Sequence, residues 1–331
     1  MRRFPCPACG RSLFFGNDRC GVCDTEVAYV PADDCFSALA DVQPCVNRDG
    51  PGVCNWATTD GEHEHCANCR LDLVPDLSPL VATFQQARRR TLRQLFRFDL
   101  DPAQLTPPLQ FQLLESDADH PVITGHENGV ITLDVAEADP VRLAEVRTSM
   151  GERYRTPIGH VRHELGHWYW AAMVEQNADP SVLEDFRSVF GDETLDYANA
   201  LEKHYASGDD GSWRTSYVTH YASSHPWEDF AETFAHYLHL ADTLETARSF
   251  PLVDLDAPGP VDGEHDELWR ADFDVVYPQW LELTTVLNEL NRSMGVAEAY
   301  PFAPPPPAID KLAWLHRVLT AGPAGPAPLP D

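Results

Sequence analysis

Cysteine placement constrains this chain more than any other feature of its sequence. All nine cysteines lie within the first 69 of 331 residues, and none follows. Cys6, Cys9, Cys20 and Cys23 form two CxxC pairs that are separated by ten residues. Two such pairs offer four thiolates to one tetrahedral zinc ion, so the spacing predicts a zinc ribbon rather than disulfides.

A second set of cysteines follows with less regular spacing. Cys66 and Cys69 form another CxxC pair, whereas Cys45 and Cys54 are separated by eight residues. We interpret these four as a second structural zinc site. Cys35 is then left over, and it could take the place of Cys45 as a ligand.

The pattern of apolar residues predicts three parts and an α+β fold. Residues 1–75 form the double zinc ribbon, residues 76–300 a mainly helical domain with a small antiparallel sheet, and residues 301–331 a Pro-rich strap with a flexible tail. Runs rich in β-formers predict strands at 109–114 and 129–135. Helical spacing predicts helices over 78–98, 156–176, 180–190, 193–206, 226–241 and 278–293.

Charge and hydropathy narrow the class of partner. The formal charge is −28, from 24 basic and 52 acidic residues, and a field of that sign disfavours nucleic acid and anionic membranes. The first residues contain no apolar stretch typical of a secretory signal, and the longest apolar runs are too short to span a bilayer. We therefore expect a cytoplasmic protein.

The segment HELGH carries the strongest chemical signal. It places His163 and His167 four residues apart on one helix, so both imidazoles point to the same side and can bind one zinc ion. Glu164, beside the first histidine, can take a proton from water without binding the metal.

Two histidines need a third protein ligand, which a later helix can supply. The HExxHxxGxxH extension is absent because Trp170 and Met173 occupy its two positions. Pro226 is a good first residue for a helix in which Glu228 and Glu232 share one face. We predict that Glu228 binds the metal and that Glu232 orients a ligand histidine.

The strings EDFAETF, GHVRHELGHWYW, HPWEDFAETFAHYLH and LNELNRSMG carry a resemblance. EDFAETF resembles the ExFAExF element of gluzincin metallopeptidases, the group that includes the anthrax lethal factor catalytic domain. The resemblance implies a zincin-like fold, Glu228 as zinc ligand, and Tyr221, seven residues before it, as donor to the transition-state oxyanion. With the paired CxxC motifs, most of the chain resembles a bacterial family of zinc-binding metallopeptidases, whose name supplies no substrate.

Other polar residues near these motifs receive weaker interpretations. His225, just ahead of the ligand helix, is a second candidate for the oxyanion donor. We interpret His160 as a packed or orienting histidine, and Asp229 as either a solvated or a helix-dipole carboxylate rather than a metal ligand. One helix carries a basic patch that we interpret as a solvated face near acidic neighbours: Arg88, Arg89, Arg90, Arg93 and Arg97.

We expect a zinc metallopeptidase that uses one catalytic and two structural Zn²⁺ ions and acts on a peptide or protein. Two alternatives stay open: a partner-binding or regulatory protein that retains the fold with little turnover, and a zinc amidase for a non-peptide substrate. Any macromolecule at the ribbon is expected to be a protein. The strand at 129–135 is a candidate sheet edge for an extended peptide.

Overall fold

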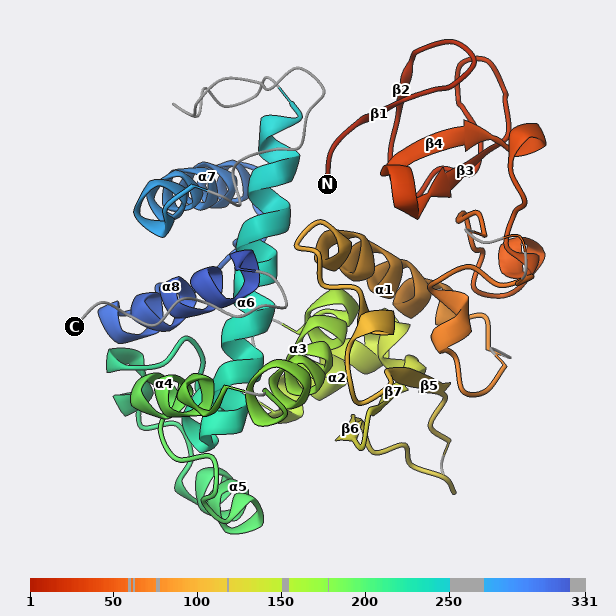
Figure 1. Cartoon of the computed structure of the whole chain (residues 1–331). Helices are drawn as coiled ribbons and strands as arrows, with labels where there is room; N and C mark the ends of the chain where they lie inside the picture. The colour runs from red at the N-terminus through yellow and green to blue at the C-terminus, as the bar shows by residue number, and fades with distance from the viewer. Residues whose placement is uncertain are drawn as a thin grey trace. The chain divides into compact units, whose positions relative to one another are not determined.

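Two units make up the chain in a computed structural model that describes residues 1–58, 61, 63–75, 78–117, 119–150, 155–177, 179–250 and 271–321. The first unit contains residues 1–97, 101–103 and 107–161, and the second contains residues 98–100, 104–106 and 162–331. Figure 1 labels the helices and strands of both. The outermost part of the predicted tail, residues 322–331, lies outside the described residues.

The cysteine-rich region contains two small antiparallel hairpins (Figure 1). Strand β1 (Phe4–Pro5) pairs with β2 (Ser12–Leu13), and β3 (Val27–Val30) pairs with β4 (Cys35–Ala38). Their inner faces share an aromatic core with ring centroids 4.9–6.4 Å apart, formed by Phe4, Phe15, Tyr29, Phe36 and Trp56. The region therefore combines its cysteine clusters with a continuous apolar core.

Arginines of the basic patch on helix α1 (Val81–Phe96) form ion pairs within the first unit. The Arg88 and Arg93 side chains are each only 1% exposed. Arg88 pairs with Asp72 at 2.6 Å, and Arg93 pairs with Asp34 at 2.7 Å. The expected acidic neighbours are present, but the interpretation as a solvated face is wrong, because these two guanidinium groups are buried and paired with carboxylates.

The sheet of the first unit is mixed, which corrects the expected antiparallel arrangement. Strand β7 (Val130–Asp134) pairs in parallel with β5 (Gln110–Leu114) and antiparallel with β6 (Gly125–Glu127). The strand predicted at 129–135 is therefore central, and its role as a free sheet edge is wrong. Alternating apolar residues indicate a strand but do not specify the direction or number of its neighbours.

Helices form most of the remaining structure. Helix α2 (Pro140–Met150) belongs to the first unit, and α3 (Pro157–Trp170) follows it along the chain and continues as a π-helical turn, Ala171–Glu175. The later helices are α4 (Pro180–Phe190), α5 (Tyr197–Ser207), α6 (Pro226–Arg248), α7 (Phe273–Ser293) and α8 (Pro306–Thr320). A mainly helical domain after a cysteine-rich region is thus confirmed, although α8 begins inside the predicted strap. None of the helices in the described ranges has the length and hydrophobicity that crossing a bilayer requires.

Helix α6 is central to the second unit, where it packs against α4, α7 and α8 (Figure 1). It approaches α3 closely at Gly166, where an added Cβ would lie 2.9 Å from Ala231 Cα and 3.2 Å from Phe234 Cβ. Only glycine allows this separation of the two backbones. Gly166 belongs to the HELGH motif. The close contact therefore sets the distance between α3 and α6 at the position of the two motif histidines.

We predict that Gly166→Val lowers the free energy of unfolding by about 2 kcal/mol, because the added carbons force the two helices apart. Ala198→Val is the matched control, since Ala198 is exposed on α5 and its substitution adds only a small helix-propensity cost. Urea denaturation followed by circular dichroism compares the variants. An equal loss in both would show that the crossing has no special packing constraint.

Candidate metal sites and active site

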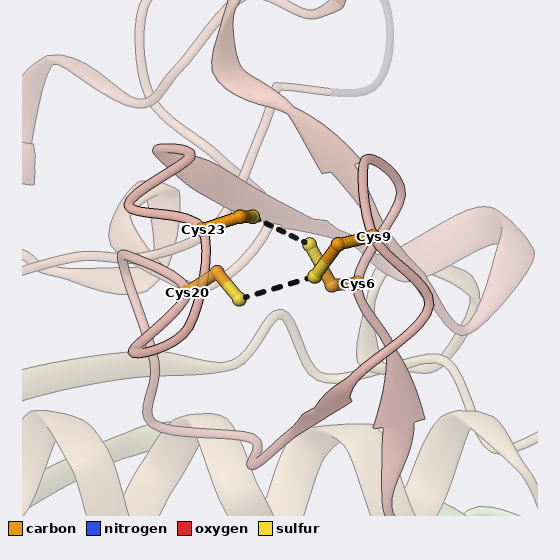
Figure 2. A group of neighbouring side chains, drawn as sticks. All are labelled: Cys6, Cys9, Cys20 and Cys23. Carbon is orange, nitrogen blue, oxygen red and sulfur yellow. Dashed lines mark hydrogen bonds between the residues drawn. The ribbon is translucent and has the colours of Figure 1, made fainter.

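Four thiols converge in the first cysteine group. Sγ of Cys6 lies 3.7 Å from Sγ of Cys23, and Sγ of Cys9 lies 3.8 Å from Sγ of Cys20 (Figure 2). A zinc ion with four Zn–S bonds of about 2.3 Å would separate neighbouring sulfurs by about 3.8 Å, whereas a disulfide needs about 2.05 Å. The hydroxyl of Thr25 donates to Cys23 at 3.2 Å and lowers the pKa of that thiol to about 6. The separations of the group's sulfurs therefore fit one zinc ion bound by four cysteines.

A second buried group consists of Cys45, Cys54, Cys66 and Cys69. Sγ of Cys54 lies 3.5 Å from Sγ of Cys66, close to the spacing of zinc-bound thiolates. The fourth cysteine of this group is Cys45. Cys35 is the first residue of β4 and does not belong to the group. The sequence left these two open, and the long-range packing of the region decides between them.

Three side chains of the second unit form another candidate metal site. Nε2 of His163 and Nε2 of His167 are 3.1 Å apart, and Glu228 Oε2 lies 3.1 Å and 3.3 Å from them. Tetrahedral ligands with metal bonds of about 2.0–2.1 Å are separated by about 3.3 Å. The set of two imidazoles and one carboxylate, as well as its spacing, therefore fits zinc.

The ligand helix begins immediately before its metal-facing carboxylate. His225 is the N-cap of α6, where its Nδ1 accepts a hydrogen bond from Trp227 N at 3.1 Å, and Pro226 is the first helical residue. This start places Glu228 in the first turn with its side chain 1% exposed. Burial acts to raise the pKa of Glu228, but His167 and His163 hold it well below its usual value. The carboxylate is therefore a ready ligand.

Glu232 and Thr219 hold His163 from its outer side. Nδ1 of His163 donates to Glu232 Oε1 at 2.7 Å, and the hydroxyl of Thr219 donates to Glu232 Oε2 at 2.7 Å. Burial opposes the charged carboxylate, but the hydrogen bond and charge of His163, with smaller contributions from His236 and Thr219, together lower the pKa of Glu232 to about 2. These two hydrogen bonds fix the His163 ring so that its Nε2 faces Glu228. Glu232 lies where the sequence predicted it, whereas no local pattern indicated Thr219.

His167 is held by packing more than by hydrogen bonds. Its ring centroid lies 4.0 Å from that of Trp227, and its Nδ1 has no hydrogen-bond partner in the part of the chain that the structure describes. Glu164 is buried on the same helix, one residue after His163, and its negative charge contributes to raising the pKa of Tyr197. The carboxyl group of the HELGH motif therefore acts within the same cluster as the three candidate ligands.

Two tyrosines approach the candidate ligands. The ring of Tyr221 lies 5.9 Å from the ring of His163, and burial followed by the charge of Glu228 raises its pKa well above the usual value. Tyr197, which the sequence did not single out, donates its hydroxyl to Glu228 Oε1 at 2.6 Å. Only the fold reveals this contact, since the two residues are 31 positions apart.

Two further histidines have structural partners. Nε2 of His225 donates to the carbonyl of Leu195 at 3.1 Å, so both of its ring nitrogens have backbone partners. His160 lies 3.1 Å from Glu137, and with Arg155 it lowers the pKa of that buried carboxyl to about 2. His160 is therefore paired to a carboxylate and is not a member of the candidate metal site.

Asp229 is buried, so its interpretation as a solvated carboxylate is wrong, whereas its expected place near the helix N-terminus, in the first turn of α6, is confirmed. It pairs with Lys311 of α8 at 2.6 Å, and the two side chains are 1% and 8% exposed. Lys311 also donates to the carbonyl of Ser216 at 3.1 Å. One ammonium group thus connects α8, the residue after Glu228, and the segment that leads to Thr219 and Tyr221.

Comparisons with known proteins agree with this geometry. Residues 79–318 match a family model described as "putative zinc-binding metallo-peptidase", and residues 3–79 match a zinc-ribbon domain. Proteins from Mycobacterium bovis and from two strains of Mycobacterium tuberculosis, each named as uncharacterized, are 38% identical over 96% of this chain and 95% of their own length. No solved structure shows a significant match.

We predict three zinc ions per chain by metal analysis, because three groups of side chains have ligand spacing. Cys66→Ser is expected to retain two ions, and His167→Ala is expected to lose only the ion that a chelator removes most readily. Cys35→Ser is the control and should retain three. A count of one or none in the wild-type chain would contradict the scheme.

We also predict that Lys311→Met lowers the free energy of unfolding by about 3 kcal/mol, because it leaves a buried carboxyl without its cation. The loss is limited since burial raises the pKa of Asp229 to about 7, so that the carboxyl can take up a proton instead. Adding Asp229→Asn should recover part of the stability. Exposed Lys203→Met is the control, and urea denaturation measures all variants; similar values for both lysines would refute the prediction.

Proposed function

Since this chain belongs to the family of zinc-binding metallo-peptidases, we propose that it hydrolyses peptide bonds at the site formed by His163, His167 and Glu228. One observation carries the proposal. Two imidazole nitrogens of α3 and one carboxylate oxygen of α6 converge at zinc-ligand spacing, and α3 also carries Glu164. A site that served only to bind metal would have no need of that further carboxyl group.

Each residue has a distinct role in the proposed reaction. Zinc bound at this site would supply a Lewis acid for the substrate carbonyl and would lower the pKa of water. Glu164 takes a proton from the attacking water and then transfers it to the leaving amine. Glu232 and Thr219 keep His163 oriented while charge develops.

Tyr221 is the proposed donor to the oxyanion that forms in the transition state. Its ring is near His163, and its raised pKa keeps the phenol protonated at neutral pH. His225 was the other candidate from the sequence. We do not assign it this role, because both of its nitrogens bind backbone groups at the start of α6.

We predict that Glu164→Gln reduces cleavage of a peptide library by at least about 10²-fold while all three zinc ions stay bound, because only the proton acceptor is lost. Glu175→Gln, at an exposed position in the turn after the same helix, should cleave at the wild-type rate. Mass spectrometry of the products and metal analysis provide the two measurements.

Other outcomes distinguish the alternative functions. Zinc-loaded wild type that cleaves no peptide but captures a protein through its ribbon would favour the partner-binding or regulatory protein. Hydrolysis of small amides, without peptide cleavage, would favour the amidase.

A further inference from the structure

The two oxygens of Glu228 face different partners. Oε2 lies 3.1 Å from Nε2 of His163, whereas Oε1 accepts a hydrogen bond of 2.6 Å from the hydroxyl of Tyr197. A carboxylate can bind a metal through one oxygen or through both. A strong donor that occupies one oxygen leaves only the other for the metal and fixes the rotation of the group.

The first turn of α6 holds Tyr197 in place. The Tyr197 ring makes edge contacts with His225 and Trp227, at centroid separations of 5.3 Å and 5.6 Å. His225 also donates to the carbonyl of Leu195, two residues before the tyrosine. The residues that begin the ligand helix therefore fix the backbone and the ring of the side chain that binds Glu228.

Helix α5, which carries Tyr197, lies at the surface of the second unit. None of its residues is fully buried, and Gly191 and Gly208 on either side have φ angles of 101° and 66°. Tyr197 as a whole residue is 37% exposed, although its hydroxyl reaches a carboxylate side chain that is 1% exposed. The phenol thus connects a surface helix to the interior of the site.

The Tyr197 hydroxyl is the donor in its bond to Glu228, because a carboxylate oxygen can only accept. Tyr221 also interacts with the Tyr197 hydroxyl but does not bind Glu228 in any contact among the described residues. The two phenols therefore differ in which part of the site they can influence.

We propose that Tyr197 is a positioning residue, which holds Glu228 so that Oε2 alone binds the metal. The inference rests on the metal site of the proposed function but concerns metal binding rather than hydrolysis. It separates the two tyrosines: Tyr197 acts on the affinity and coordination of the metal, and Tyr221 acts on the substrate.

The test compares Tyr197→Phe, Tyr221→Phe and Tyr205→Phe in the full chain. Each variant loses one hydroxyl and keeps the ring, and Tyr205 is the matched control because it lies on α5 and is exposed. The affinity for the chelator-labile zinc ion is measured by competition. We expect a loss of about 10–100-fold for Tyr197→Phe and no change for the other two variants.

Two further readouts separate positioning from a general loss of structure. Cobalt(II) placed in the labile site should give weaker visible bands in Tyr197→Phe, because a carboxylate that binds through both oxygens raises the coordination number. If peptides are cleaved, raising the free zinc concentration should restore turnover of Tyr197→Phe. It should not restore turnover of Tyr221→Phe.

The outcomes distinguish this proposal from the proposed function. Wild-type zinc affinity and an unchanged cobalt spectrum in Tyr197→Phe would overturn the positioning role, even if peptides are cleaved. Weakened zinc binding in Tyr197→Phe supports that role even if no variant, nor the wild type, cleaves a peptide. A wild-type chain without the labile zinc ion would overturn both.

Discussion

The candidate active site depends on the close crossing of α3 and α6 at Gly166 and Ala231. At this separation the two histidines of α3 reach a carboxylate in the first turn of α6, and the three ligand atoms lie 3.1–3.3 Å apart. A larger residue at the crossing would increase the distance between the helices before it affected any ligand directly. The HELGH motif thus contains a packing requirement as well as the candidate chemical groups.

Burying several carboxylates in one helical turn is costly unless each has its own partner. Glu228 lies against two imidazoles and accepts from Tyr197, Asp229 pairs with Lys311, and Glu232 binds His163 and Thr219. These partners belong to α3, α5, α8 and the segment before α6. The start of α6 is therefore fixed from several directions, which keeps a charged site rigid in a low-dielectric interior.

The cysteine-rich region needs other sources of stability, because a segment of this size has little apolar surface to bury. It combines two four-cysteine groups with an aromatic core and with buried guanidinium groups from α1. Arg88 also donates to the side chain of Asn68, which lies between two cysteines of the second group. In the first unit, helix α1 is thus part of the structure that supports the second cysteine group.

The sequence alone determined what depends on local spacing. Residues four apart share a helix face, and CxxC pairs form compact knuckles. The two histidines, Glu164, Glu228, Glu232 and the first four cysteines could therefore be predicted as candidate site residues from the sequence. Only the tertiary structure decided which distant residues meet: Tyr197 with Glu228, Lys311 with Asp229, Cys45 rather than Cys35, and a parallel strand beside β7. The reason is physical, since backbone periodicity repeats over a few residues, whereas long-range contacts arise from the packing of whole helices and strands.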